Sequence, residues 1–103
     1  MKKFIKDGKV GVAISLGYGA GWSSWSYDYR KELCMDSNIV ELVLNDELEK
    51  LRMYVEKMYP DAYTGGYSQL VVKWVPEGMS FEINEFDGYE TLCTLGYQTH
   101  MVA

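Results

Sequence analysis

Two Asp-Gly pairs, at residues 7–8 and 87–88, constrain the fold of this chain more than any other feature. Each pair lies between apolar runs. Asp-Gly in that position is the strongest short-range signal for a β-hairpin, because both turn residues must adopt positive φ. The first pair predicts a hairpin that joins residues 4–6 to 9–16. The second pair predicts a hairpin whose last strand covers residues 89–95.

The strand predicted at residues 9–16 has two different faces. Its branched residues alternate with small ones, so that Val10, Val12, Ile14 and Leu16 are separated by Gly11, Ala13 and Ser15. Successive side chains of a strand point to opposite faces, which makes one face branched and the other nearly bare. A bare face allows another layer to approach closely, and we expect a helix there rather than a partner chain or a ligand.

The middle of the chain predicts two helices, at residues 37–44 and 46–59. Ser37 is the expected cap of the first helix, and Asn45 or Asp46 that of the second. In the second helix one apolar stripe follows helical spacing, and Pro60 ends the element. The stripe consists of Leu48, Leu51, Val55 and Met58. Its first three residues are expected to be buried against Val10, Val12 or Ile14, or against Leu70 and Val72.

The last third of the chain predicts a β-meander. Residues 70–75 and 81–84 alternate, and Pro76-Glu77-Gly78 turns the chain between them. The element order is then ββ-αα-βββ, which indicates an α+β fold: one antiparallel twisted sheet of about five strands with two helices packed on one face. We expect a single domain over residues 1–103. Residues 27–36 fit a short helix or a strand equally well, and the tail at 96–103 fits an irregular end or an edge strand.

Composition excludes several classes of protein. Apolar residues make up 48% and charged residues 24% of the 103 residues, as in an ordinary globular domain. The net charge of −5 argues against binding to duplex nucleic acid. No apolar run approaches the roughly 20 residues of a membrane span, and residues 1–6 do not form a signal peptide, so we expect a cytoplasmic protein without a membrane partner. With two cysteines and one histidine the chain has too few ligands for a Cys/His zinc site, and no metal or cofactor is expected.

The glycine-rich, aromatic loop at residues 17–26 is the candidate binding site. Backbone amides freed by the glycines can hold an anion, indole and phenol rings can stack on a base, and a nearby guanidinium can bind phosphate. These features predict a small anionic nucleotide-type ligand. The candidate ligand-binding residues are Tyr18, Gly19, Gly21, Trp22, Ser23, Trp25 and Arg30.

The same loop has a purely structural interpretation. It matches neither the GxxxxGK[ST] motif nor a dinucleotide fingerprint. Its glycines are then needed only for positive φ, and Trp22 and Trp25 are anchors in the core or in an interface. Both interpretations remain open at the level of sequence.

Catalysis has little support in the sequence. The only histidine, His100, lies in the terminal tail, and the acidic residues of the last hairpin are normally solvated in such positions. Those acidic residues are Glu82, Glu85, Asp87 and Glu90. We therefore expect a protein that is not an enzyme, with an enzyme acting on a nucleotide as the alternative.

Two segments of the chain resemble a family of small proteins encoded by bacteriophages and prophages. The first is Tyr-Gly-Ala-Gly-Trp-Ser-Ser-Trp at residues 18–25. The second combines Trp-Val-Pro-Glu-Gly-Met-Ser-Phe-Glu-Ile at residues 74–83 with Glu-Phe-Asp-Gly-Tyr-Glu at residues 85–90. The family carries no catalytic residues that can be transferred to this chain.

The resemblance implies a setting in the host cytoplasm, where small phage proteins often counter bacterial defence. It suggests a non-enzymatic binding protein that sequesters a nucleotide second messenger. The alternative is an inhibitor that binds a host defence protein through an acidic, aromatic-rich surface. Because so many aromatic residues are costly to expose, we also expect a homo-oligomer.

Overall fold

Strands lie at both ends of the chain, and helices lie between them. The computed structural model describes residues 1–94 and 101–103. Its strands are β1 (Ile5–Lys6), β2 (Lys9–Ser15), β3 (Leu70–Pro76), β4 (Ser80–Phe86), β5 (Tyr89–Thr94) and β6 (Met101–Val102). Its α-helices are α1 (Arg30–Met35), α2 (Ser37–Leu44) and α3 (Leu48–Met58), and its 3-10 helices are η1 (Ser23–Trp25), η2 (Tyr27–Tyr29) and η3 (Tyr67–Gln69). The α+β class is therefore confirmed.

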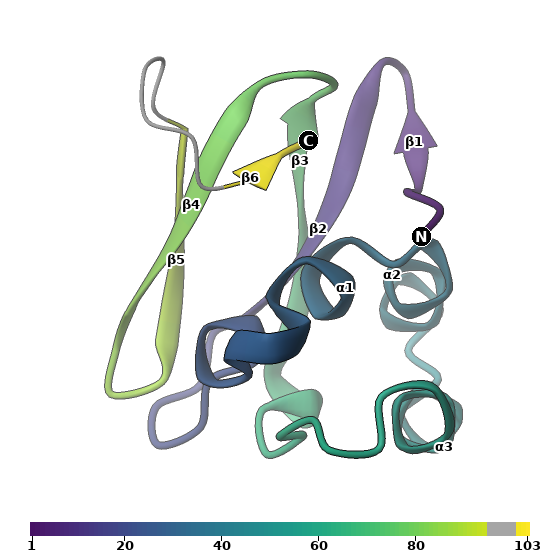
Figure 1. The fold of residues 1–103 in the computed structure, drawn as a ribbon, viewed down its shortest axis with the longest axis vertical. Helices are drawn as coiled ribbons and strands as arrows, with labels where there is room; N and C mark the ends of the chain where they lie inside the picture. The colour runs from purple at the N-terminus through teal and green to yellow at the C-terminus, as the bar shows by residue number, and fades with distance from the viewer. Residues whose placement is uncertain (95–100) are drawn as a thin grey trace.

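The described strands form two antiparallel sheets in place of the predicted single sheet (Figure 1). Their strand orders are β1-β2-β3 and β5-β4-β6. The expected meander pairing of β3 with β4 is wrong, because β3 pairs with β2 from Lys9 opposite Pro76 to Ser15 opposite Leu70. After the turn at residues 76–78 the chain enters a second layer. There Phe81 and Met101 close over the branched face of β2.

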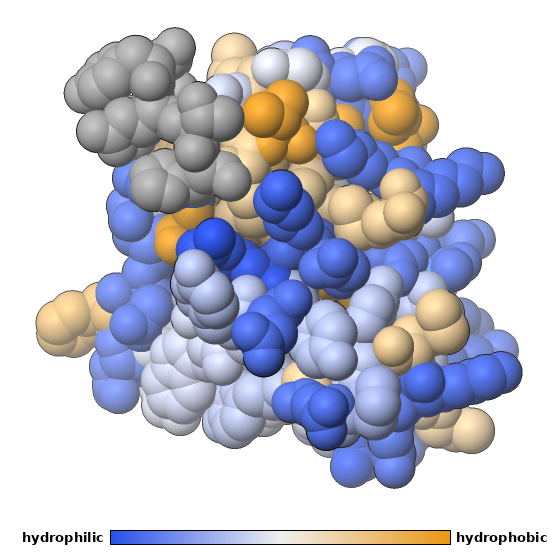
Figure 2. All heavy atoms as spheres, viewed as in Figure 1, coloured by the Kyte–Doolittle hydropathy of each residue, from blue (hydrophilic) through white to orange (hydrophobic). Residues whose placement is uncertain are grey.

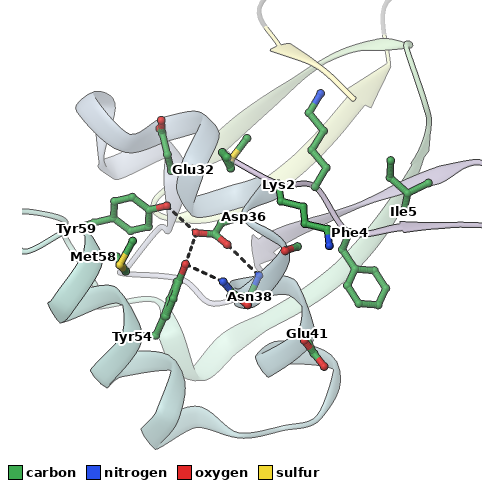
Figure 3. Close-up of a pocket in the computed structure, with 13 residues that line it drawn as sticks. Lys2, Phe4, Ile5, Glu32, Asp36, Asn38, Glu41, Tyr54, Met58 and Tyr59 are labelled. Atoms are coloured by element: carbon green, nitrogen blue, oxygen red, sulfur yellow. Dashed lines mark hydrogen bonds between the residues drawn. The ribbon is translucent and has the colours of Figure 1, made fainter.

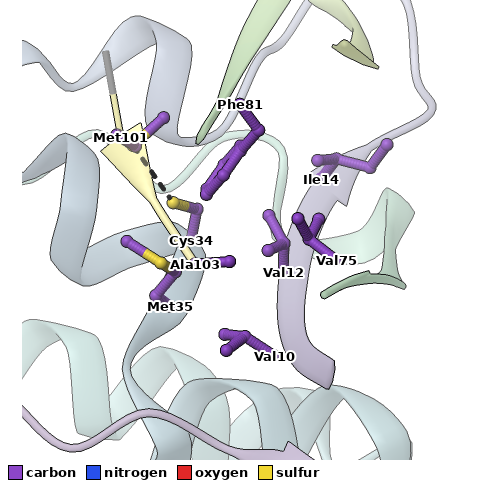
Figure 4. Packing of buried hydrophobic residues seen from close by; sticks show 9 residues of the cluster. All are labelled: Val10, Val12, Ile14, Cys34, Met35, Val75, Phe81, Met101 and Ala103. Atoms are coloured by element: carbon purple, nitrogen blue, oxygen red, sulfur yellow. Dashed lines mark hydrogen bonds between the residues drawn. The ribbon is translucent and has the colours of Figure 1, made fainter. Parts of the chain in front are cut away.

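The two faces of β2 meet different layers. The branched face packs against Phe81 of β4 and Cys34 of α1 (Figure 4). The bare face lies under the helices, since a Cβ atom added to Gly11 would be 2.7 Å from Cγ1 of Val40 in α2. The predicted packing of a helix on this face is therefore confirmed.

The middle of the apolar stripe of α3 is buried as expected, while Met58 at its end is 50% exposed. Leu51 and Val55 are fully buried and belong to one cluster with Ala13 of β2. Leu70 of β3 packs against the same cluster, so the expected contact with Leu70 is found, whereas Val72 is not part of the cluster. Leu48 is only partly buried at its edge.

Both predicted Asp-Gly turns are confirmed. Asp7 and Gly8 have φ values of 54° and 75°, and Asp87 and Gly88 have values of 49° and 87°. These are the left-handed conformations that a tight two-residue hairpin requires. At the end of the chain, β6 pairs with β4 at the edge of its sheet. Residues 95–100, which include His100, lie outside the described residues.

The helix caps differ from those predicted. Asp36, not Ser37, caps α2, because its carboxylate accepts a hydrogen bond from the Asn38 amide at 2.9 Å. Neither Asn45 nor Asp46 caps α3; Glu47 precedes that helix without a side-chain cap. Asp46 has φ of 55°, a left-handed turn conformation in place of the extended one that a capping residue adopts.

The undecided segment at residues 27–36 is helical, since it contains η2 and α1. No helix of the described residues is long and apolar enough to cross a membrane.

Candidate functional site

The glycine-rich loop is held by a buried carboxylate from the far end of the chain. Glu90 of β5 is 1% exposed. Its Oε1 accepts a hydrogen bond from the Ser15 amide at 2.8 Å, and its Oε2 accepts from the amides of Trp22 at 2.8 Å and Ser24 at 3.1 Å. The Ser24 hydroxyl donates to the same Oε2 atom. The loop amides therefore form an anion-binding nest, and an internal carboxylate fills it.

The turn of the last hairpin also contacts the loop directly. The Gly19 amide donates to the carbonyl oxygen of Asp87. A Cβ atom on Gly88 would lie 2.5 Å from the nitrogen of Ala20, so the turn and the loop touch backbone to backbone. This contact requires glycine at position 88 as well as the left-handed φ described above.

The structure separates the predicted ligand-binding residues into a buried and an accessible group. Gly21, Trp22 and Ser23 are buried. The indole of Trp22 is fully buried, and its Nε1 donates to the carbonyl oxygen of Leu33 at 2.7 Å. In this conformation no ligand can stack on Trp22.

The accessible group consists of four of the seven predicted residues. Tyr18, Gly19 and Trp25 are exposed, and Arg30 is half-buried. Tyr18 stacks on Tyr89 with ring centroids 5.0 Å apart. Trp25 and Arg30 have other aromatic neighbours, so the exposed Tyr18 and Trp25 rings do not form one stack.

Exposed aromatic side chains gather around the tip of the β4–β5 hairpin. We call them the aromatic rim, and they are Tyr18, Trp25, Tyr27, Tyr63 and Phe86, with 69%, 39%, 79%, 41% and 78% of their surface exposed. In Figure 2 the lower left of the molecule, where Figure 1 places η1, η2 and the hairpin tip, is a pale area of intermediate hydropathy bordered by hydrophilic residues. Exposed aromatic side chains that gather on one side of a protein are a common feature of interaction surfaces.

Contacts join three members of the aromatic rim, which are Trp25, Tyr27 and Tyr63. Trp25 and Tyr63 have ring centroids 5.4 Å apart, and Trp25 Nε1 donates to the Glu85 carboxylate at 3.3 Å. Tyr27 lies beside both rings, because the three line one shallow hollow of about 210 Å³. Tyr18 reaches the hairpin tip from the glycine-rich loop.

The charge around the rim is predominantly acidic. Asp28 and Asp61 line the hollow with the aromatic rings, and Glu85 bonds to one of them. Arg30 is the basic side chain found here, with its guanidinium carbon 5.0 Å from the centroid of the Tyr27 ring. The rim is therefore suited to a cationic partner more than to an anion.

A second cavity, of about 690 Å³, lies between the N-terminal segment and the helices (Figure 3). Asp36 is at its centre and is 5% exposed. Its Oδ2 atom accepts hydrogen bonds from the hydroxyls of Tyr54 at 2.7 Å and Tyr59 at 2.6 Å. The Asn38 side-chain amide in turn donates to the Tyr54 hydroxyl at 3.1 Å.

The two tyrosines of this cavity remain protonated. Burial raises the pKa of Tyr59, and the hydrogen bond to Asp36 raises it further. Burial also raises the pKa of Tyr54, where the bond from Asn38 acts in the opposite direction and Asp36 adds to the rise. Protonated hydroxyls that donate to a carboxylate cannot serve as bases at neutral pH. The cluster therefore acts as a clamp that holds α3 to the beginning of α2.

Within residues 1–94 and 101–103, no group of three or more His, Cys, Asp or Glu side chains is placed to hold a metal ion. A scan against protein-family models finds no match for this chain, and searches of curated proteins and of solved structures find none either.

Sequence reasoning missed Glu90 as the residue that organises the loop. A usable signal was present, because Glu90 and Leu92 lie two residues apart and share one face of their strand. A carboxylate on the apolar face of a strand must find donors. Tyr27, Tyr63 and Phe86 were also missed as members of the rim, and no local pattern distinguishes them from core aromatics.

Proposed function

We propose that this chain is a non-enzymatic binding protein whose aromatic rim docks on a basic and apolar surface of a protein partner. One observation carries the proposal: the aromatic rim exposes five large aromatic side chains around one hairpin tip. Aromatic side chains are enriched in protein interfaces and supply most of their hot spots. The acidic residues beside the rim favour a partner of opposite charge and speed its association.

The glycine-rich loop and the hollow beside Trp25 give less support to a second function, the capture of a nucleotide second messenger. The amides that were expected to hold a phosphate are occupied by Glu90, and Trp22 is buried. The hollow beside Trp25 contains two carboxylates, Asp28 and Asp61, which repel an anion. Sequestration of a nucleotide stays a prediction with its own test below.

The resemblance to small phage proteins supplies the setting of this proposal. In that setting the partner is a host defence protein, and binding inhibits it by covering a surface that it needs. The action is stoichiometric and requires no catalytic residue.

The first test is site-specific crosslinking in a bacterial lysate. A photoreactive phenylalanine derivative replaces Tyr27 in the rim, and the same derivative replaces Glu56 on α3 as the control. We expect a protein captured from position 27 and not from position 56. That protein is then purified and titrated with the wild-type chain.

Two rim variants and one matched control decide the outcome. Tyr27→Ala and Phe86→Ala each remove a side chain that is more than three-quarters exposed, so both variants should melt like the wild type. A hot spot contributes about 2 kcal/mol or more, so each change should weaken binding at least about 30-fold. Met53→Ala removes an exposed apolar side chain of α3, 68% exposed, and should leave binding unchanged.

Equal affinity of the rim variants and the wild type would contradict the proposal. A parallel calorimetric titration uses cyclic dinucleotides and ADP-ribose-type nucleotides. Saturable binding that is lost in Trp25→Ala would favour sequestration of a nucleotide over a protein partner.

A further inference from the structure

The hollow of about 210 Å³ at the aromatic rim is lined by aromatic rings and by carboxylates. These two kinds of group attract the same class of ligand, since ring faces and carboxylates both favour a cation. The hollow therefore differs in chemistry from the amides of the glycine-rich loop, which hold an anion. Its rings are those of Trp25, Tyr27, Tyr29 and Tyr63, and its carboxylates are those of Asp28 and Asp61.

The indole of Trp25 is held in place from two sides. Its Nε1 donates to the Glu85 carboxylate, which also accepts a hydrogen bond from the Gly88 amide at 2.8 Å. A Cβ atom on Gly21 would be 2.6 Å from Cδ1 of the indole, so the ring lies against backbone that carries no side chain. Glycine at position 21 thus leaves the space that the indole occupies.

Tyr63 is held in a similar way. Its amide donates to the Ser26 hydroxyl at 3.1 Å, and that hydroxyl donates to the Tyr63 carbonyl oxygen at 3.2 Å. A Cβ atom on Gly65 would overlap the Tyr63 hydroxyl, so this ring also lies against a glycine. One serine therefore joins the two segments that form the hollow, residues 25–29 and 61–63. Walls that are fixed before binding lose less entropy when a ligand enters.

Neither carboxylate of the hollow forms an ion pair within the described part of the chain. Asp28 and Asp61 are both exposed, and the ion pairs found there join residues at and beside α3. The guanidinium of Arg30 lies over the Tyr27 ring, but Arg30 does not line the hollow. The hollow therefore keeps an excess of negative charge, which attracts a cation from outside.

The volume and the rings favour a guanidinium over an ammonium group. A water-sized group takes up roughly 30 Å³, so a hollow of about 210 Å³ holds about seven of them. That is the size of an arginine side chain, whereas a lysine side chain would leave part of the hollow to water. A guanidinium is also planar, stacks on aromatic rings and is more weakly hydrated than an ammonium, and it pairs with carboxylates through two N–H groups at once.

We propose that this hollow binds one arginine side chain of the protein partner. The guanidinium lies against the rings of Trp25 and Tyr63. Its N–H groups donate to the carboxylates of Asp28 and Asp61. The inference rests on the proposed function, because the hollow belongs to the aromatic rim, and it names the residue that the rim recognises. Arginine is enriched in protein interfaces and among their hot spots, as an anchor in an aromatic hollow would be.

The test uses tripeptides with blocked ends, in which glycine flanks arginine, citrulline or lysine. Citrulline has the shape of arginine without its charge. Binding is followed by NMR through the indole N–H signal of Trp25, which is assigned with Trp25→Phe. The arginine tripeptide should saturate this signal in the millimolar range and bind at least about fivefold more tightly than the citrulline tripeptide and about twofold more tightly than the lysine tripeptide. No saturable shift up to about 20 mM, or equal affinity for arginine and either of the other two, overturns the proposal.

Removal of charge tests the roles of the two carboxylates. Asp28→Asn and Asp61→Asn should each weaken the arginine tripeptide by about two- to fivefold and leave the citrulline tripeptide unchanged. Asp7→Asn is the matched control, since Figure 1 places the β1–β2 turn at the top of the view, away from the hairpin tip at the bottom. Arg30→Gln removes a like charge and should strengthen binding by about twofold. If Asp28→Asn and Asp61→Asn behave like the control, or if Arg30→Gln weakens binding, the proposal fails.

Gly65→Ala tests whether the Tyr63 ring must occupy its place. Gly65 is exposed, so the variant should melt like the wild type while its Cβ displaces the ring. Both Gly65→Ala and Tyr63→Ala should bind the arginine tripeptide at least about twofold more weakly. The double variant should bind no more weakly than Tyr63→Ala, because the two changes act through one ring. Additive losses would contradict the arrangement.

Two outcomes separate this inference from the proposed function. If Tyr27→Ala and Phe86→Ala weaken the captured partner but the arginine tripeptide does not bind, the rim docks through other contacts and the arginine site alone is wrong. If the tripeptide binds as described but no protein is captured from position 27, the arginine site is supported and docking on a protein partner is wrong.

Discussion

Replacing Glu90 by glutamine should detach the glycine-rich loop from the last hairpin and destabilise the whole domain. The carboxylate accepts hydrogen bonds from the backbone amides of Ser15, Trp22 and Ser24 and from one hydroxyl. Glutamine keeps the shape of the side chain and has one oxygen in place of two. Its NH₂ group must face at least one backbone N–H, and donors facing donors cannot bond.

The expected cost follows from the number and type of these bonds. A hydrogen bond to a charged group contributes roughly 1.5–3 kcal/mol, and one between neutral groups about 0.5–1.5 kcal/mol. Weakening the bonds to three amides by about 1 kcal/mol each gives a loss of about 3 kcal/mol. A domain of this size has a total stability of about 5–15 kcal/mol. The melting temperature should fall by at least about 12 °C, at about 4 °C or more per kcal/mol.

Thermal melts followed by circular dichroism measure the global effect. Glu56→Gln, on the exposed face of α3, makes the same change in charge and should melt like the wild type. Hydrogen exchange by NMR measures the local effect, since the amides of Ser15, Trp22 and Ser24 should lose protection ahead of the core of β2.

Chemical rescue gives a sharper version of this test. Glu90→Ala leaves the nest of amides empty, and added formate should occupy it and raise the melting temperature more than chloride at equal ionic strength. If Glu90→Gln melts within about 1 °C of the Glu56→Gln control, or if formate acts like chloride, the assigned role of Glu90 is refuted.

Gly88→Ala should destabilise the fold by about 1–3 kcal/mol more than Gly78→Ala. Both glycines have φ of 87°, but only at Gly88 would the added Cβ have a backbone atom within 4 Å. Equal urea midpoints for the two variants would disprove the close contact. At about pH 8 a thiol reagent should modify Cys93 and spare Cys34, because burial and the nearby Glu90 charge raise the pKa of Cys34 to about 12. Mass spectrometry of the native protein measures the labelling, and labelling of both thiols would disprove this. That raised pKa contributes stability below about pH 9, the pKa of an unperturbed thiol, and the contribution is lost as the pH rises toward 12. Wild-type stability should therefore fall more steeply with alkaline pH than that of Cys34→Ala, by up to about 1.4 kcal/mol per pH unit. Self-association remains a prediction as well: light scattering at micromolar concentration should give a dimer or larger species, and a monomer would contradict it.

The parts of the fold that depend on neighbouring residues were predictable. The Asp-Gly turns, the boundaries of α2 and the buried stripe of α3 each follow from patterns that span a few residues. The capping of α2 by Asp36 was missed by one position, since an aspartate and a serine stand side by side and both are good caps. The Asp36 carboxylate also accepts hydrogen bonds from Tyr54 of α3 and from Tyr59, which directly follows α3, and these distant residues were not visible in the local pattern.

The parts that depend on distant residues were not predictable. Alternation along β3 shows that it is a strand, yet the pattern contains no information about whether β2 or β4 is its neighbour. The glycine-rich loop likewise has the local appearance of a phosphate-binding loop. Its anion is Glu90, which is 68 residues away from Trp22 and approaches only when the sheets are assembled.

The distance along the chain between Glu90 and the loop has a consequence for synthesis on the ribosome. Trp22 emerges 68 residues before the side chain that accepts its amide hydrogen bond. At an elongation rate of about 5–20 residues per second, the loop waits about 3–14 s for its acceptor. Until β3 (Leu70–Pro76) emerges, which takes most of that interval, β2 also lacks its partner strand, so an indole and a strand edge are exposed on the nascent chain. Translation speed over residues 23–90 should therefore influence how much of the newly made protein aggregates before it can fold.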